Sequence, residues 1–363
     1  MLSSAIPDHL QCPRAQPSRL PHAEFQPPYP AYSIRFPQDI SQLVIAIIGA
    51  QHKTRSDTAT RTSISTLSGF LTAPTATPPS FSEFASATDN KGFHNIAALA
   101  YWPSKPAYET WASESGFQTW WRSLQPETLQ NGWFLEVLFP TADRFETLFN
   151  TESNREGSAH MGQCMSGPIQ EHGYWGSMRD RLPLSQTDAL AGSKEHIKLP
   201  TTSGSSGRVI VPGKKNLAVI RSGQDWSATT PGERKLYLET MHPVLTRGMD
   251  FLRDRGEEVG CYSCRFMEIV DAKTGKAAEE EGGGGIDRTF GLAYFDELAS
   301  LEAWSREHPT HLAIFGGFQK YARTLRNEVT LRVFHEVAVL DEDQQFFEYV
   351  GCHDTTGMLA RHY

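Results

Sequence analysis

The sequence lacks any apolar run long enough to cross a membrane. The longest candidate, Leu43 to Ala50, has the length of a β-strand, whereas a membrane helix needs about 18 apolar residues. Pro7, Asp8 and His9 occupy the place where the apolar core of a secretory signal would lie. We therefore expect a cytoplasmic protein with no membrane partner.

Cysteine and excess positive charge are also scarce. The five cysteines are widely spaced apart from Cys261 and Cys264, and this pair has no second pair to complete a zinc site. Reduced thiols are therefore expected rather than a disulfide framework. The chain has 34 basic and 42 acidic residues, so it lacks the basic surplus that is typical of nucleic-acid-binding proteins.

Histidine and aromatic residues, by contrast, are abundant. The 363 residues include 13 histidines, 20 phenylalanines, 11 tyrosines and 8 tryptophans. This composition permits a buried metal or haem site without demonstrating one. The length itself favours two domains, since one domain usually has about 100–200 residues.

Proline, glycine and serine mark three irregular segments. Residues 1–35 are rich in proline, which lacks a backbone N–H and fixes φ, so we expect an extended arm that covers a surface or a partner subunit. Residues 199–207 (LPTTSGSSG) are expected to form an exposed connection near the midpoint. Residues 279–285 (EEEGGGG) lie between two strand-like runs and are expected to form a hairpin tip.

A weak internal repeat divides the chain into two copies of one unit. Three short segments recur in the same order in both halves: Tyr101 and Trp111 match Tyr294 and Trp304, Ile48–Gln51 resembles Arg221–Gln224, and Phe134–Val137 matches Phe334–Val337. Each match is weak alone, but three in the same order indicate a duplication.

Hydrophobic periodicity predicts the order β-α-β-β-α-β in each half, which is the ferredoxin-like unit of an α+β protein. The predicted elements of the first half are strands at 41–51, 80–86, 93–101 and 132–139 and helices at 57–72, 105–122 and 142–150. Those of the second half are strands at 208–222, 258–270, 286–294 and 328–340 and helices at 231–254, 296–306, 311–325 and 341–350. We expect one unit at 36–155 without a cofactor, a connecting segment at 156–207, and a second unit at 208–363.

Comparison of the two copies indicates where chemistry is located. His335 replaces Leu135, and His311 stands where the first copy has Gln118. Ser222 falls close to Gly49 or Ala50 in the comparison. The second half therefore has two histidines and a serine at positions that carry no reactive group in the first, and we expect the site there.

The two histidines favour a haem over a zinc ion. His311 begins a helix with an apolar face, and His335 lies on an alternating strand with its side chain on the apolar side. No third histidine or thiol is placed to complete a zinc site, whereas haem needs only one axial histidine in an aromatic pocket. Hydrogen-bonded core histidines are the simpler alternative. Arg179, in the segment 171–181, can bind an oxygen-bearing ligand or a haem propionate, or else form a surface ion pair.

Several segments resemble the haem-containing aldoxime dehydratases, which include phenylacetaldoxime and alkylaldoxime dehydratases. The matching segments are SAIPDHLQCPR (Ser4–Arg14), EHGYWGSMRDR (Glu171–Arg181), IRSGQDW (Ile220–Trp226), GMDFLRDRG (Gly248–Gly256), SREHPTHLAIF (Ser305–Phe315), FHEV (Phe334–Val337) and CHDTTGML (Cys352–Leu359). They extend over the whole chain.

The resemblance implies a fold and a reaction. The fold would be a pair of ferredoxin-like units forming a dimeric α+β barrel-like structure, similar to chlorite dismutases and dye-decolourising peroxidases. The reaction would convert an aldoxime, R–CH=N–OH, to a nitrile and water. The cofactor would be haem b, ferrous when active, and the substrate would bind it through the oxime nitrogen.

The resemblance also implies a role for each candidate residue. His311 would be the proximal haem ligand, and His335 the distal histidine that acts first as acid and then as base. Ser222 and Arg179 would hold the oxime hydroxyl, and Glu146 would hold the charge or tautomer of His335.

Other functions fit the same residues. A haem peroxidase or chlorite-dismutase-like enzyme, a non-catalytic haem-binding protein, and a dimer with buried histidines and no cofactor are the alternatives. The proline-rich arm and the apolar helix residues favour a homodimer. The choice between aryl and alkyl aldoximes stays open.

Overall fold

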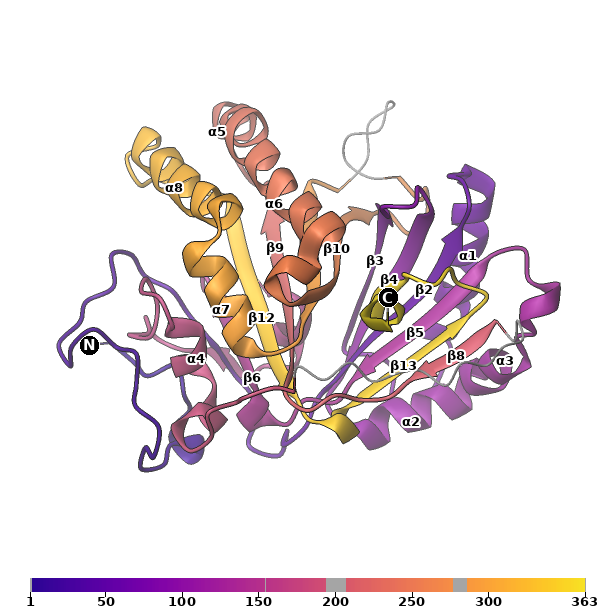
Figure 1. Ribbon diagram of the computed structural model, residues 1–363, viewed down its shortest axis with the longest axis horizontal. Coiled ribbons are helices and arrows are strands. Elements are labelled where there is room, and N and C mark those ends of the chain that lie inside the picture. Colours follow the sequence, from indigo (N-terminus) through magenta and orange to yellow (C-terminus); the bar gives the residue numbers. More distant parts are fainter. Residues whose placement is uncertain (1, 154, 194–206, 277–285, 363) are drawn as a thin grey trace.

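The strands of the chain form one large curled sheet with the helices on its outer face (Figure 1). This computed structural model describes residues 2–153, 155–193, 207–276 and 286–362. The sheet has 11 strands in the order β6-β12-β9-β11-β10-β3-β4-β2-β5-β13-β8. The predicted connection at 199–207, apart from Gly207, and the predicted tip at 279–285 lie outside the described residues.

The first half builds one end of this sheet. Its elements in chain order are β2 (Val44–His52), α1 (Asp57–Leu71), β3 (Phe81–Thr88), β4 (His94–Trp102), α2 (Lys105–Glu114), α3 (Phe117–Ser123) and β5 (Gly132–Leu138). The strands lie side by side in the order β5-β2-β4-β3, all antiparallel. The predicted order β-α-β-β-α-β is confirmed for these elements.

The second half repeats this arrangement. Its elements are β9 (Leu217–Asp225), α5 (Pro231–Leu236), α6 (His242–Arg255), β10 (Cys261–Val270), β11 (Arg288–Phe295), α7 (Leu298–Glu307), α8 (Pro309–Thr324) and β12 (Arg332–Leu340). The strand order β12-β9-β11-β10 has the connectivity of the first half. The two halves join where β10 pairs with β3. Both halves therefore contribute strands to one sheet in an α+β fold.

Two predicted helices are strands instead. Residues 142–150 contain β6 (Phe145–Phe149), and 341–350 contain β13 (Gln345–Val350). Each follows the last strand of one half and pairs with the last strand of the other half, β6 with β12 and β13 with β5. Neither segment, FETLF or QFFEYV, alternates regularly between apolar and polar residues. The pairing with the other half could therefore not be predicted from the local pattern.

Two short strands, β8 and β1, lie at the margins of the fold. The predicted strand 208–222 is interrupted, with β8 (Arg208–Val211) at the sheet edge beside β13 and β9 starting at Leu217. The arm contributes β1 (Ile34–Arg35), which pairs with β7 (Cys164–Met165) in a separate small sheet. The arm thus lies against the chain's own connecting segment.

Two glycine–phenylalanine pairs fix how the halves correspond. A Cβ at Gly49 would lie 2.1 Å from the ring of Phe134, and one at Gly223 would lie 2.3 Å from the ring of Phe334. Each glycine therefore lets a phenylalanine on the neighbouring strand cross over it. Gly223 thus corresponds to Gly49, and Ser222 corresponds to Ile48 rather than to Gly49 or Ala50 as predicted.

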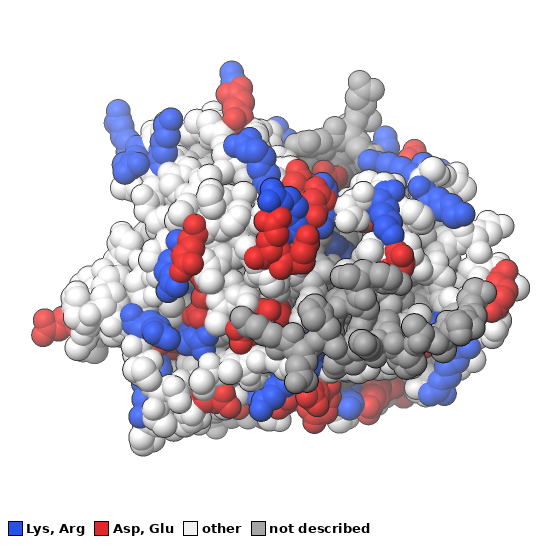
Figure 2. Space-filling model, viewed as in Figure 1, with Lys and Arg blue, Asp and Glu red and all other residues white. Residues whose placement is uncertain are grey.

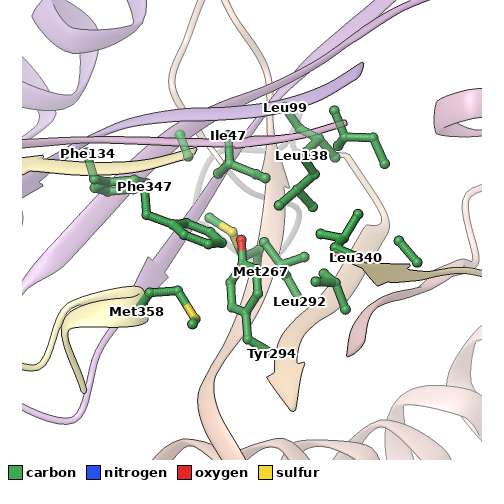
Figure 3. Close-up of a cluster of buried hydrophobic side chains, with 14 of the residues drawn as sticks. Ile47, Leu99, Phe134, Leu138, Met267, Leu292, Tyr294, Leu340, Phe347 and Met358 are labelled. Carbon is green, nitrogen blue, oxygen red and sulfur yellow. The ribbon is translucent and has the colours of Figure 1, made fainter. Parts of the chain in front are cut away.

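The core between the halves lies inside the curl of the sheet (Figure 3). Leu99 and Leu138 of the first half and Leu292 and Leu340 of the second belong to it. Two buried hydrogen bonds cross it: the Tyr101 hydroxyl donates to Glu336 at 2.6 Å, and the Tyr294 hydroxyl donates to Glu136 at 2.7 Å. Among the helices of the described chain, none is long and apolar enough to span a bilayer.

Candidate active site

The outer face of the sheet differs between the two halves. In the first half, Ile48 and Leu135 are neighbours on β2 and β5 and belong to an apolar cluster that also contains Trp111 of α2. In the second half, the corresponding neighbours are Ser222 on β9 and His335 on β12. The duplication therefore places a polar pair where the other copy has core.

His335 lies beside a buried ion pair. Its Nε2 is 3.0 Å from Glu146 Oε1 and 2.8 Å from an Nη2 of Arg181. Arg181 Nε and Nη2 both donate to Glu146, at 2.7 and 3.1 Å. The side chains of Arg181 and Glu146 are 2% and 1% exposed, whereas that of His335 is 18% exposed. Only the histidine of this group can therefore meet a ligand.

The strand β6 brings Glu146 to this position. Glu146 pairs with Val337 on β12, two residues beyond His335, so both side chains project from the same face of the sheet. Burial alone would raise the pKa of Glu146, but the charges of Arg181 and His335 and their hydrogen bonds bring this pKa below its usual value. Glu146 is therefore an ionised acceptor at neutral pH.

Two groups of the site are available for a ligand. His335 Nδ1 makes no hydrogen bond to any described residue and keeps solvent access. Ser222 is half-buried, and its hydroxyl has no hydrogen-bond partner in the described chain. An imidazole nitrogen and a hydroxyl can thus both reach a substrate lying above β9 and β12.

Arg179 lies elsewhere. Both Arg179 and Arg181 belong to α4 (Ser177–Arg181), a helix of one and a half turns. Arg179 donates through Nε and Nη2 to Glu302 of α7, and through Nη1 to the carbonyl of Ala189 at 2.6 Å. Helical residues two apart project in very different directions, so Arg181 contacts His335 and Glu146 while Arg179 faces Glu302.

His311 lies on α8 with an unpartnered nitrogen. Its Nδ1 is buried and makes no hydrogen bond within the described residues. The ring contacts Trp304 with centroids 4.8 Å apart. Burial lowers the pKa of His311, and the Ser305 backbone opposes this only in part. A neutral, buried imidazole suits ligation of a metal.

The other histidine of the HPTH segment has a structural role. His308 precedes α8, and its Nδ1 accepts a hydrogen bond from the backbone N–H of Thr310. Its ring stacks on Phe251 at 4.0 Å. His308 therefore caps the helix, and His311 is the histidine of this segment that is free for a ligand.

The surroundings of His311 fit a haem. Among the described residues of α8, Tyr321 alone is fully buried, although the helix carries Leu312 and Phe315, which are 41% and 38% exposed. Trp175, 42% exposed, contacts the rings of both His311 and Phe315. A haem held by one histidine would cover this exposed apolar surface of α8 and Trp175. No cluster of three or more His, Cys, Asp or Glu suited to a bare metal ion occurs in the part of the chain described.

Arg181 is the residue that sequence reasoning missed. Nothing in the local sequence distinguishes it from Arg179, because both are basic, neighbouring residues of one short segment. Only its contact with Glu146, which depends on β6 pairing with the other half, singles it out.

Comparisons with known proteins agree with this geometry. Residues 46–358 match the model of a family described as haem-containing dehydratase. An aliphatic aldoxime dehydratase of Pseudomonas chlororaphis is 38% identical over 99% of this chain and 98% of its own. A phenylacetaldoxime dehydratase of a Bacillus species is 30% identical over 91% of this chain and 90% of its own. A crystal structure of an aldoxime dehydratase with butyraldoxime superposes with a TM-score of 0.88, at 36% identity and covering 99% of this chain and 96% of that one. The chain belongs to the haem-containing dehydratase family.

Proposed function

We propose that this protein dehydrates aldoximes to nitriles with haem b, ferrous in the active state, held by His311. The observation that carries the proposal is the group of Ser222, His335 and Glu146 on one sheet face, with Arg181 of α4 bonded to it. Full-length similarity to aliphatic and phenylacetaldoxime dehydratases supports the substrate class. Haem bound at His311 would supply an electron-rich iron that takes the oxime nitrogen and weakens the N–O bond.

The side chains then move the protons. Ser222 hydrogen-bonds the oxime hydroxyl and orients it toward His335. Glu146, ionised and 3.0 Å from Nε2, stabilises the positive charge of the protonated ring. Nδ1 of protonated His335 gives its proton to the leaving hydroxyl, and water departs. The neutral Nδ1 then takes the proton from the aldoxime carbon as the C≡N bond forms, which restores the protonated histidine.

Arg181 acts through its neighbours. Its guanidinium donates to Glu146, to the carbonyl of Glu171 and to the hydroxyl of Ser177, so its donors are engaged within the protein. We assign it as a positioning residue that holds the carboxylate and the imidazole in place. Binding of the oxime hydroxyl by Arg179 stays a prediction from the family resemblance.

We further propose that 36–155 and 208–363 are two ferredoxin-like units joined by the segment 156–207, after an arm at 1–35. The shared strand order supports the two units, with β6 and β13 as additions exchanged between them. The homodimer and the cytoplasmic location stay predictions from the sequence.

The function is tested by incubating the haem-loaded protein with butyraldoxime under anaerobic, reducing conditions. We expect butyronitrile in amounts far above those from free haem, measured by gas chromatography. The oxidised protein with peroxide and a peroxidase dye is the comparison. Rapid dye oxidation without any nitrile would instead support the haem peroxidase alternative.

The two arginines of α4 give a matched test of the positioning role. Arg181→Lys keeps the charge but removes the two-pronged contact with Glu146, and we expect kcat to fall by about 100-fold because small misplacements of catalytic groups are costly. Weaker pairing also raises the pKa of Glu146, so the acidic limb of the kcat–pH profile moves to higher pH. Arg179→Lys, which alters a similar contact with Glu302 and none with Glu146, should leave the acidic limb of this profile near that of the wild type. Equal effects of both variants would contradict the assignment.

A further inference from the structure

A row of residues crosses the sheet from the candidate site toward the other half. Ser222 on β9 pairs with Gly291 on β11, which in turn pairs with Phe266 on β10, so the three positions share the outer face. On the opposite side of Ser222 the row continues with His335 and Leu148. A substrate tail above Ser222 thus meets side chains on one side and a glycine on the other.

One side chain, Met249 of α6, fills the space above this glycine. A Cβ at Gly291 would lie 2.7 Å from Met249 Sδ. Methionine is unbranched and flexible, so it adapts to a changing neighbour more readily than other apolar side chains. Met249, which is 9% exposed and packed in the apolar cluster under α6, therefore closes the end of the row.

A cleft opens on the far side of Met249. Strand β10 pairs with β3 only over Glu268–Val270, and upstream of this segment the two strands diverge. The cleft lies at this divergence, and Met249, Cys264 and Phe266 form its apolar wall. It begins about two strand spacings, or roughly 10 Å, from Ser222.

The polar rim of the cleft is already engaged within the protein. Asp89 accepts hydrogen bonds from His353 and Asn95, and Arg253 pairs with Asp250 at 2.9 Å. Charged groups of both signs gather over α6 on this face of the molecule (Figure 2). The surface left to bind a ligand is therefore the apolar wall beneath that rim.

We infer that this cleft takes the hydrocarbon tail of the aldoxime, with Met249 as the gate between it and the reacting group. The inference rests on the proposed function and specifies its substrate class: aldoximes with long alkyl or aryl-alkyl tails. A short tail such as that of butyraldoxime ends before the cleft. A longer tail displaces the Met249 side chain and buries its outer carbons against Cys264 and Phe266.

Chain length is the variable that tests the gate. For the haem-loaded wild type, kcat/KM is measured for linear aldoximes from butyraldoxime to decanaldoxime, and each methylene that enters the cleft should contribute about fourfold. Met249→Phe, which fills the passage, is expected to lower the ratio of octanaldoxime to butyraldoxime kcat/KM by about tenfold or more. Met249→Ala, which widens it, is expected to raise this ratio.

The matched control is Leu252→Ala. Leu252 is one turn further along α6 in the same apolar cluster, and it is 2% exposed but does not line the cleft. It should lower stability without changing the chain-length ratio. Binding of octanenitrile relative to butyronitrile, measured by isothermal titration calorimetry, should follow the same order among the variants without turnover.

The outcomes separate the two proposals. Nitrile formation with the same chain-length ratio in all four proteins overturns the gate and leaves the proposed function intact. Absence of nitrile from every aldoxime overturns both. A Met249 variant that loses haem or changes its absorbance spectrum, with an unchanged ratio, assigns the cleft to the edge of the haem instead and also overturns the gate.

Discussion

Replacement of His311 by alanine is expected to abolish haem binding and, with it, all dehydration of aldoximes. His311 offers a neutral, buried imidazole on a helix whose apolar residues are left exposed. Without His311, the apolar side chains near it, such as Phe315 and Trp175, would be left to hold the haem. The measurement is the Soret absorbance per protein after reconstitution and desalting, together with nitrile formation. Imidazole added to the variant should restore part of both.

His308→Ala is the control for this experiment. It removes the other histidine of the HPTH segment, whose Nδ1 caps α8. Loss of such a cap costs about 1 kcal/mol of stability, so the variant should melt earlier but keep its haem. A His311→Ala protein with a normal Soret band, or loss of haem from His308→Ala alone, would contradict the axial assignment.

Replacement of His335 by alanine is expected to lower kcat by about 10²–10⁴-fold while haem stays bound. This range is typical for the loss of a general acid or base. His335 Nδ1 is the free nitrogen of the site, and the other nitrogen is held by Glu146 at 3.0 Å. Dehydration needs the proton twice, first on the leaving hydroxyl and then from the aldoxime carbon. The variant should therefore fail in both steps, as measured by single-turnover nitrile formation.

Val333→Ala controls for the loss of volume. Val333 is two residues from His335 on β12 and projects from the same face, but it carries no ionisable group. Its kcat should stay within a small factor of the wild type, and its pH profile should be unchanged. Near-full nitrile formation by a haem-loaded His335→Ala protein would remove the histidine from the mechanism.

The repeat was the part of the fold that the sequence could predict. Alternating and helical periodicities located the four strands and the covering helices of each half, because those elements bury one face each. The helices predicted at 142–150 and 341–350 were wrong, because each segment forms a strand by pairing with the other half. Local pattern carries no information about that partner.

In the candidate site, too, some residues could be predicted from the sequence and others could not. His335 and Ser222 stood out because the sister copy has apolar residues at those positions, and the structure pairs them directly. Glu146 was named through the family resemblance, on a segment predicted to be a helix, and it reaches His335 as part of a strand. Arg179 was also named through the family resemblance. The local sequence does not distinguish it from Arg181, whereas their contacts do, because Arg179 pairs with Glu302 and Arg181 with Glu146.

The pairing of β6 with the other half also determines when the catalytic group can assemble during synthesis of the chain. Glu146 and His335 meet across 189 residues of chain, a loop that folding must close before the catalytic group exists. When the ribosome has made the first half, Glu146 and strand β6 are therefore already present, but β12 and His335 do not yet exist. Until β12 is made, the edge of β6 that will pair with it has no strand partner. The connecting segment with Arg181 is the part of the site made next. The catalytic group is complete only after His335 has been made.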